Sequence, residues 1–345
     1  MNHTNQLSLR ARIERANALR ASIEHFYIYI FLLLLVLIFS VVKLDQVELF
    51  GRGHFLSPAS IINLLRSAIP ILTLCGSFTL LMISGYIDLS VGSAMSLSAV
   101  VFALMVLNGF PLAMAMATVL TMGLLLGCLN GLLVMKLRIT PVIATLVTLS
   151  LYKGIALLIV PKGLSAIKGS ADMRMPAWIN DYARKDFLLG LPVAFYVAVA
   201  VIVILVIVQR RTILGKYAVA IGGNRTSAEL SGINAVGMVW ILYILVGFFA
   251  ALAGIARASY MSMGDPLSGD GMEFDCIIAV LLGGTAFSGG KGSVAKTVVG
   301  ALIIMCVTTG LMTVIPAFWQ NFAKASVLII AVVLNHLLVR SKAMA

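Results

Sequence analysis

The sequence is poor in charge. Asp, Glu, Lys and Arg make up only 11% of its 345 residues, whereas 61% are hydrophobic. Soluble domains contain about 25% charged and roughly 45–50% apolar residues, so a water-soluble fold could not bury this surplus. The apolar residues form unbroken runs of about 20, the length that crosses roughly 30 Å of hydrocarbon. We therefore predict an all-α, polytopic transmembrane helical bundle.

Cysteine and histidine are also scarce, with four residues of each type. The cysteines are scattered in or beside apolar runs, without a CxxC pair or a histidine at metal-ligand spacing, so we expect small buried side chains. The histidines are equally dispersed, which argues against a catalytic triad or a metal site. These residues are Cys75, Cys128, Cys276, Cys306, His3, His25, His54 and His336.

A nucleotide-binding loop is missing as well. The string from Gly284 to Lys291 is glycine-rich, but a P-loop needs a glycine five residues before the one that precedes the lysine, and Thr285 stands there. Gly292 occupies the place of the magnesium-binding Ser or Thr. We expect no cofactor in this chain, so any energy from ATP must enter through a partner that binds ATP and Mg²⁺.

Basic residues are in excess, since 25 Lys and Arg against 13 Asp and Glu give a net charge of +12. They lie in a terminal arm and in short connectors, not on a basic face interleaved with aromatics, which argues against nucleic-acid binding. Their expected role is to orient membrane spans, because cytoplasmic loops are enriched in Lys and Arg. The basic arm can also hold anionic lipid headgroups.

The apolar segments predict about ten spans in one transmembrane domain, 26–340, between a basic arm, 1–25, and a short tail, 341–345. The first segment is too long for a cleaved secretion signal and no A-x-A site follows it, which favours a retained helix. The predicted spans are 26–42, 61–84, 88–107, 112–135, 141–160, 191–208, 236–260, 274–288, 297–315 and 320–339.

Alternate crossings place connector cations such as Arg210 and Lys291 on the side of the Arg-rich N-terminus, so both termini are predicted to be cytoplasmic. The segment 274–288 is shorter than a normal crossing, and a re-entrant hairpin is the alternative. Because a hairpin would place Lys296 and Arg340 against the charge rule, we favour a short or broken span.

Asp88 and Ser90 lie between two apolar spans with glycines on both sides. An acid at the membrane centre costs roughly 2.5–3.5 kcal/mol on insertion scales, and is usually kept for a pathway, a partner or a helix end. Two interpretations stay open. Asp88 caps a helix that begins at Leu89, with Ser90 assisting, or both residues belong to a translocation path or gate.

The span 112–135 contains Gly123, Gly127 and Gly131 at steps of four. This spacing predicts close packing against a neighbouring helix, because lipid-embedded helices associate through small residues. Asn130, beside these glycines, either lines a path or ties two helices together.

The connector 209–235 is the longest predicted cytoplasmic segment after the N-terminus. Its sequence predicts a turn at 222–224, a cap at Thr226 or Ser227, and a short helix that ends at Gly232. A short helix along the membrane surface suits docking to another protein.

Four motifs stand in order along the chain: IDLSVG at 87–92, TPVIATL at 140–146, AIGGN at 220–224 with LSGIN at 230–234, and AVLLGGT at 279–285 with GGKG at 289–292. Together they resemble the ribose, xylose and galactoside branch of bacterial ABC permeases, in the branched-chain-type permease superfamily. The resemblance extends from about residue 60 to 338.

The resemblance implies a multi-pass protein of the bacterial inner membrane that imports a small sugar. It implies two permease subunits, two cytoplasmic ATPase subunits, an extracytoplasmic sugar-binding protein and a core of the vitamin B12-type permease fold. It also implies that the coupling segment docks in a groove of the ATPase. The residues concerned are Gly222, Gly223, Asn224, Arg225, Glu229 and Gly232, with Arg225 and Glu229 as candidate polar contacts. The loops 161–190 and 261–273 are the expected docking surfaces for the binding protein.

Two other transport functions stay open: a stand-alone ion- or proton-coupled secondary transporter, and an ABC permease for branched-chain amino acids. Proton coupling needs titratable groups buried in the membrane, and beyond Asp88, Asp275 and His336 the sequence offers few. A membrane-embedded enzyme would need a nucleophile and a base at useful spacing, which we do not find.

Overall fold

The computed structural model describes residues 57–160 and 175–312, together with positions 29, 32–34, 36–37, 322 and 326. In this part of the chain every named element is a helix, and Leu188 and Leu191 form an isolated bridge. The all-helical prediction is therefore confirmed there. Outside these ranges lie most of the predicted spans 26–42 and 320–339, the arm 1–25, the tail 341–345 and the loop residues 161–174.

Four of the described helices are long and apolar enough to cross a membrane. A bent pair, α2 and α3, makes a fifth crossing if it is counted as one span, with an angle of 46° at the break. Pro70 explains the bend, because proline lacks an amide hydrogen and its ring displaces the carbonyl four residues earlier. The elements are α2 (Pro58–Ser67), α3 (Ile69–Ile83), α5 (Leu112–Gly131) with its π-helical continuation η1 (Leu132–Lys136), α6 (Pro141–Ile159), α8 (Val193–Arg211) and α11 (Ala235–Met261).

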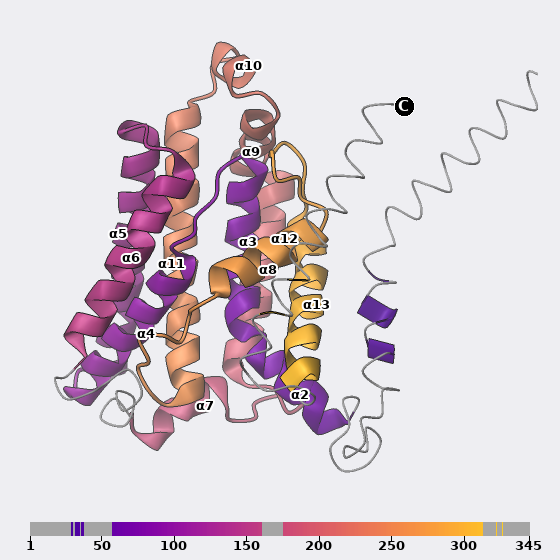
Figure 1. Cartoon of the computed structure of the whole chain (residues 1–345). Coiled ribbons are helices and arrows are strands. Elements are labelled where there is room, and N and C mark those ends of the chain that lie inside the picture. The colour runs from indigo at the N-terminus through magenta and orange to yellow at the C-terminus, as the bar shows by residue number, and fades with distance from the viewer. Residues whose placement is uncertain are drawn as a thin grey trace, which may run out of the picture.

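Two helices, α4 (Val91–Leu107) and α12 (Met272–Leu282), begin in the middle of the bundle and run away from each other (Figure 1). The 11 residues of α12 give about 16 Å of helix, roughly half of a bilayer core. The predicted short or broken span 274–288 is therefore helical only as far as Leu282, because Gly283 and Gly284 end the helix in a turn. Likewise α4 begins at Val91 and not at Leu89, since residues 84–90 are not helical.

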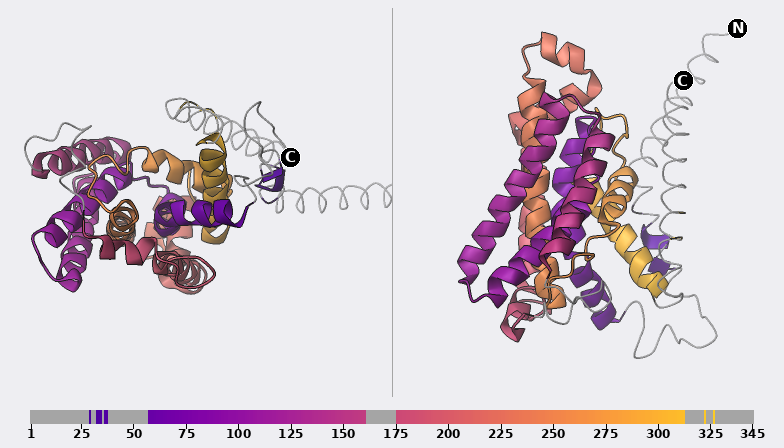
Figure 2. Two further views of the ribbon diagram at one scale, coloured as in Figure 1. Left: turned by 90° about the horizontal axis from the view of Figure 1, so that it is seen from below. Right: turned by 60° about the vertical axis from the view of Figure 1, so that its left-hand side comes forward.

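The remaining elements lie at the two ends of the bundle or along its edge. The short helix α10 (Arg225–Leu230) projects beyond one end, next to α9 (Ile213–Gly223), and α7 (Asn180–Ala183) lies at the opposite end with η2 (Ala177–Ile179) (Figures 1 and 2). We call these the α10 end and the α7 end. At the edge, α13 (Val294–Met312) packs against α3 and α12.

The centre of the molecule is α11, which packs against α3, α4 and α5. In its most apolar window 61% of the residues are buried, compared with 22–28% in α5, α6 and α8. The long helices around α11 therefore turn much of their apolar surface outward, as expected of helices that face lipid.

Candidate functional site

The α10 end contains the segment that the sequence singles out for docking. Here α9 ends at Gly223 and α10 begins at Arg225. Asn224 caps α10, because its backbone is extended (φ −160°) and its Oδ1 accepts a hydrogen bond from the Ser227 N–H at 2.9 Å.

This geometry corrects two local predictions. The turn expected at 222–224 is instead the last turn of α9, which the sequence analysis did not predict as a helix. The cap expected at Thr226 or Ser227 is provided by Asn224, so α10 starts earlier than expected. The helix ends before Gly232, whose φ of +83° suits glycine, and the Ile233 N–H then donates to the Ala228 carbonyl at 3.1 Å.

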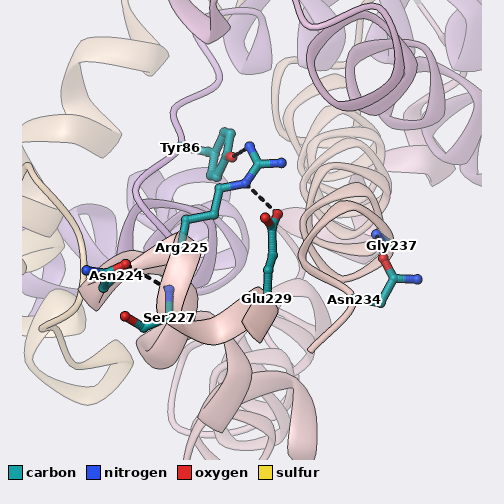
Figure 3. A network of polar contacts seen from close by, with 7 residues as sticks. All are labelled: Tyr86, Asn224, Arg225, Ser227, Glu229, Asn234 and Gly237. Carbon is teal, nitrogen blue, oxygen red and sulfur yellow. Dashed lines mark hydrogen bonds and ion pairs between the residues drawn. The ribbon is translucent and has the colours of Figure 1, made fainter. Parts of the chain in front are cut away.

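Arg225 makes two side-chain contacts (Figure 3). Its Nε donates to Glu229 Oε1 at 2.8 Å, and its Nη1 donates to the Tyr86 hydroxyl at 2.8 Å. The bond to Glu229 is the main reason that the pKa of Arg225 is raised, so the guanidinium stays charged. Tyr86 belongs to the non-helical segment 84–90, so Arg225 connects α10 with a part of the chain 139 residues away.

One apolar side chain on α10 stands out. Leu230 is 85% exposed although α10 projects beyond the end of the bundle, where lipid-facing helices do not reach (Figure 1). A single exposed apolar side chain is common on protein surfaces, so it is the projecting helix together with Leu230 that suits a protein contact. Sequence reasoning did not select Leu230, because a leucine in a six-residue helix carries no signal of its own.

Below α10, three chain segments meet through glycines. A Cβ on Gly222 would lie 1.9 Å from the Ile83 carbonyl oxygen, and one on Gly290 would lie 3.0 Å from Gly223 Cα. The Gly290 N–H donates to the same Ile83 oxygen at 2.7 Å. A Cβ on Gly289 would lie 2.7 Å from Gly85 N. We call this contact between the ends of α3 and α9 and the loop after α12 the glycine junction.

Asp88, Ser90 and Asn130 come together in the interior. Ser90 donates to Asp88 Oδ1 from its N–H at 2.8 Å and from its Oγ at 2.7 Å. Asn130 Nδ2 donates to Asp88 Oδ2 at 3.0 Å and to Ser90 Oγ at 2.8 Å. The three side chains are at most 2% exposed. Asp88 therefore binds the backbone just before α4, as a capping residue does, and also ties this segment to α5, whereas its place in a translocation path stays a prediction.

Two tyrosines extend this network. The Tyr152 hydroxyl of α6 lies 3.4 Å from Asn130 Oδ1 and donates to the Leu126 carbonyl at 2.9 Å. The Tyr243 hydroxyl of α11 donates to the Ile87 carbonyl at 3.0 Å. The segment 84–90 is thus held by side chains from α5 and α11, and Tyr152 of α6 supports Asn130.

Helix α4 and the chain just before α12 touch where the two helices begin. A Cβ on Gly92 would lie 2.3 Å from the Gly269 oxygen and 2.4 Å from Glu273 Oε2, and one on Gly269 would lie 2.1 Å from the Gly92 oxygen. The Gly269 N–H donates to Ser96 Oγ at 2.8 Å. This contact brings a second buried carboxylate, Glu273, to the beginning of α4, where the helix dipole favours a negative charge.

The predicted glycine groove lies against α11. A Cβ on Gly123 would lie 2.6 Å from the Gly247 oxygen, and one on Gly127 would lie 2.3 Å from the Tyr243 oxygen. A Cβ on Gly131 would lie 2.1 Å from the ring of Trp240, whose Nε1 donates to the Cys128 carbonyl at 3.0 Å. The backbones of α5 and α11 can approach this closely only because these positions lack side chains.

The α7 end contains exposed ion pairs and a cavity. Lys153 Nζ lies 2.6 Å from Asp270 Oδ2, Arg66 pairs with Asp186, and Arg184 stacks on the Tyr260 ring at 5.1 Å. A cavity of about 330 Å³ is lined by Phe102, Leu112, Met116, Trp178, Ile179, Asp181, Tyr182, Ile255 and Ser259. The described parts of the loops 161–190 and 261–273 therefore lie together, joined by a hydrogen bond from the Met175 N–H to the Ser262 carbonyl at 2.8 Å.

Within the described residues no group of three His, Cys, Asp or Glu side chains is placed to hold a metal ion. Cys75, Cys276 and Cys306 are buried and Cys128 is half-buried. The glycine-rich string near Lys291 forms part of the glycine junction, so its glycines serve close backbone contact.

Comparison with known families decides the class of protein. The family described as branched-chain amino acid transport system / permease component matches residues 60–335. The chain belongs to this family. It is accordingly a multi-pass membrane protein of the permease type, and the family resemblance expected from the four motifs is confirmed.

Curated relatives cover most of the chain. The ribose import permease protein RbsC of Haemophilus influenzae is 35% identical over 286 residues, which are 82% of this chain and 87% of the relative. RbsC of Bacillus subtilis is 33% identical over 82% of this chain and 86% of the relative. The D-allose transport system permease protein AlsC of Escherichia coli is 33% identical over 85% of this chain and 89% of the relative. No solved structure gives a significant match.

Proposed function

We propose that this chain is the membrane-spanning permease subunit of an ATP-binding-cassette importer for a small, monosaccharide-like sugar in a bacterial inner membrane. The family assignment supports transport, and the relatives named for ribose and allose import support a sugar over a branched-chain amino acid. A stand-alone secondary transporter is disfavoured, because the family is described as a component of a transport system. The chain itself is a transport component and not an enzyme.

The α10 end is the proposed cytoplasmic face, and a separate ATPase that binds ATP and Mg²⁺ docks there. The observation that supports this most directly is the projecting α10 with its exposed Leu230. Lys136, Arg210 and Arg211 lie on elements that end at the same face, which agrees with the enrichment of cytoplasmic loops in basic residues. Both termini are proposed to be cytoplasmic, with about ten spans in a vitamin B12-type permease fold.

The rest of the assembly follows from this orientation. The α7 end would face the extracytoplasmic binding protein that delivers the sugar, with its ion pairs and aromatic side chains as a docking surface. A second permease subunit would complete the path. Asp88, Ser90 and Asn130 are the proposed gate, and all three side chains are buried and hydrogen-bonded to one another.

The test is capture through a cysteine placed on α10. Thr226 is exposed, so Thr226→Cys in inner-membrane vesicles, treated with a short bifunctional crosslinker, is expected to capture an ATPase subunit. Leu189, 82% exposed at the α7 end, gives the matched control Leu189→Cys, which should not capture that subunit. ATPase capture from Leu189→Cys, or none from Thr226→Cys, would contradict the proposed orientation.

The substrate class has its own measurement. The chain is reconstituted in liposomes with its ATPase and binding protein, and uptake of radiolabelled pentoses and hexoses is compared with uptake of leucine. We expect ATP-dependent uptake of a sugar. Uptake of leucine alone would favour the amino acid permease, and uptake driven by an ion gradient without ATP would favour a secondary transporter.

A further inference from the structure

We propose that Tyr86 and Arg225 form a positioning link that transmits displacement of α10 to the segment 84–90 and thus to the buried gate. The proposal rests on the proposed docking of an ATPase at α10. It adds Tyr86, whose role is neither to bind the ATPase nor to contact the substrate, and it gives Arg225 a role within this chain besides the polar contact expected with the ATPase.

The first step is that α10 has few attachments to the bundle. It contacts α9 and the beginning of α11, and Ala228 is its buried residue. Among the described side chains of α10, Arg225 reaches across to a residue outside the connector, the Tyr86 hydroxyl at 2.8 Å (Figure 3). A rotation or translation of α10 therefore pulls or releases Tyr86 directly.

The second step is that the segment 84–90 is suited to respond. It lies between the end of α3 and the start of α4, outside both helices, and side chains bond to residues near both of its ends. Tyr86 is held from the α10 end, whereas Asp88 and Ser90 are held from α5. A segment fixed in this way can move as a unit between two anchoring points, which a regular helix of the same length cannot do.

The third step is that the glycine junction directs the movement. The end of α9 cannot shift toward α3 without displacing the Ile83 carbonyl, because Gly222 already touches it and the Gly290 N–H is bonded to it. The loop that contains Gly290 leads back to α12, whose first turn contacts Gly92 at the start of α4. A displacement at α10 therefore reaches both α4 and α12, through 84–90 on one side and through α12 on the other.

The fourth step concerns the strength of the link. The side chains of Arg225 and Glu229 are 46% and 44% exposed, so water competes for their hydrogen bonds. Glu229 accepts a hydrogen bond from Arg225 Nε and so holds the guanidinium in place on α10, while Nη1 of the same guanidinium donates to the Tyr86 hydroxyl. A contact of this kind adds little to folding, but it can be made and broken in each cycle, as a switch element requires.

The experiment compares Tyr86→Phe with a matched hydroxyl deletion, Tyr196→Phe. Each change removes one phenolic oxygen and keeps the ring, and Tyr196 donates to the Leu188 carbonyl at the opposite end of the molecule. For each variant three quantities are measured: capture of the ATPase through Thr226→Cys, ATP hydrolysis stimulated by the loaded binding protein, and sugar uptake per ATP hydrolysed.

We expect Tyr86→Phe to keep ATPase capture and to lower uptake per ATP by about fivefold or more, the lower range of coupling between linked sites. Tyr196→Phe should leave all three quantities unchanged. Arg225→Gln should reproduce the loss, and the double variant Arg225→Gln/Tyr86→Phe should be no worse than either single variant, because both remove the same contact.

The outcomes separate the link from the docking. If the parent Thr226→Cys captures no ATPase, the proposed function fails. If it captures the ATPase and Tyr86→Phe has the parent's uptake per ATP, the positioning link alone is overturned. Loss of capture in Tyr86→Phe would also overturn it, since Tyr86 would then act in docking. An additive double variant would show that Arg225 and Tyr86 act separately and would contradict the link.

Discussion

The helix pairs α5–α11 and α4–α12 both bring two backbones into close contact, but they do so with different geometries. In both pairs glycines allow backbones to touch, with added Cβ positions at 2.1–2.3 Å from a carbonyl oxygen at Gly127, Gly92 and Gly269. In α5–α11 two continuous helices lie along each other and satisfy their own hydrogen bonds. In α4–α12 two helix starts meet at mid-height, and side chains such as Ser96 and Asn130 complete the hydrogen bonding. The first arrangement suits a rigid scaffold, and the second suits a part that moves.

The strongest way to break the scaffold is Gly127→Ala. Its Cβ would overlap backbone atoms of Tyr243 and Ile244, and overpacking of this kind costs about 1–3 kcal/mol or more. We expect a lower midpoint of thermal unfolding in detergent. Size-exclusion chromatography of heated samples measures this midpoint. The matched control is Gly154→Ala, also within a long helix, where an added Cβ meets nothing within 4 Å. A similar destabilisation in both variants would contradict the role assigned to the groove.

The equivalent change in the moving part is Gly269→Ala. The added Cβ would push against the Gly92 oxygen and separate α4 from α12. We expect a larger effect on transport than on unfolding: sugar uptake should fall about tenfold, since ~1.4 kcal/mol between two states changes their ratio tenfold. If Gly269→Ala and Gly127→Ala lower uptake in the same proportion to stability, the distinction between scaffold and moving part is wrong.

The gate network can be tested by exchanging its members. Asp88→Asn keeps an oxygen for the Ser90 N–H, but it turns an amide group toward Asn130 Nδ2 and leaves buried donors unpaired, which costs about 1–3 kcal/mol. We expect reduced uptake, and recovery in the double variant Asp88→Asn/Asn130→Asp, which restores a donor and an acceptor. Full uptake by Asp88→Asn alone would favour a simple capping role over a charged gate.

A smaller effect is expected at the projecting helix. Leu230→Ser removes an 85% exposed apolar side chain, so the thermal midpoint should not change. Capture of the ATPase through Thr226→Cys should weaken, because truncation of a central apolar contact often costs about 1–2 kcal/mol of binding. Leu189→Ser at the α7 end is the control. Unchanged capture of the ATPase in Leu230→Ser would show that this side chain is not part of the docking surface.

The smallest effect on stability is expected for Glu229→Gln. The pair Arg225–Glu229 is an exposed i,i+4 pair, and such pairs contribute about 0.3–0.5 kcal/mol. The thermal midpoint should therefore shift barely at all. A large shift of the thermal midpoint would mean that α10 is part of the rigid scaffold. The distinction between rigid and moving regions would then be wrong at this end of the molecule.

Much of the fold was predictable from local pattern. The apolar runs gave the helices α5, α6, α8 and α11 to within a few residues, because a lipid-facing helix needs apolar side chains over its whole length. The start of α4 lies within three residues of the predicted one, but the end of α12 was not predictable in the same way. The prediction 274–288 ran past Gly283 and Gly284, because apolar residues continue at Ala286 and Phe287 and hydropathy does not locate this break.

The candidate site residues also divide into those that the sequence pointed to and those that only the structure revealed. The sequence drew attention to Asp88 with Ser90, and separately to Asn130, because each is polar in an apolar setting, but it left the relation of Asn130 to the other two open. The partners Tyr86 and Gly269 were not selected, and Gly290 was noted only within a glycine-rich motif, since a tyrosine near a span end or a glycine in a loop has many ordinary roles. Their importance comes from residues far along the chain, such as Arg225 for Tyr86 and Ile83 for Gly290.

The sequence by itself determined the membrane environment, the helical class and the four motifs, and it predicted a docking segment, because these depend on hydrophobicity, local turn chemistry and order along one chain. Only the tertiary structure decided that residues 83–86 and the motifs at 220–224 and 289–292 converge beneath and beside α10, and that the start of α4 meets the chain just before α12 at Gly92 and Gly269. The physical reason is that backbone contacts between distant segments are set by how helices pack. A glycine shows that a close approach is possible, but not which segment makes it.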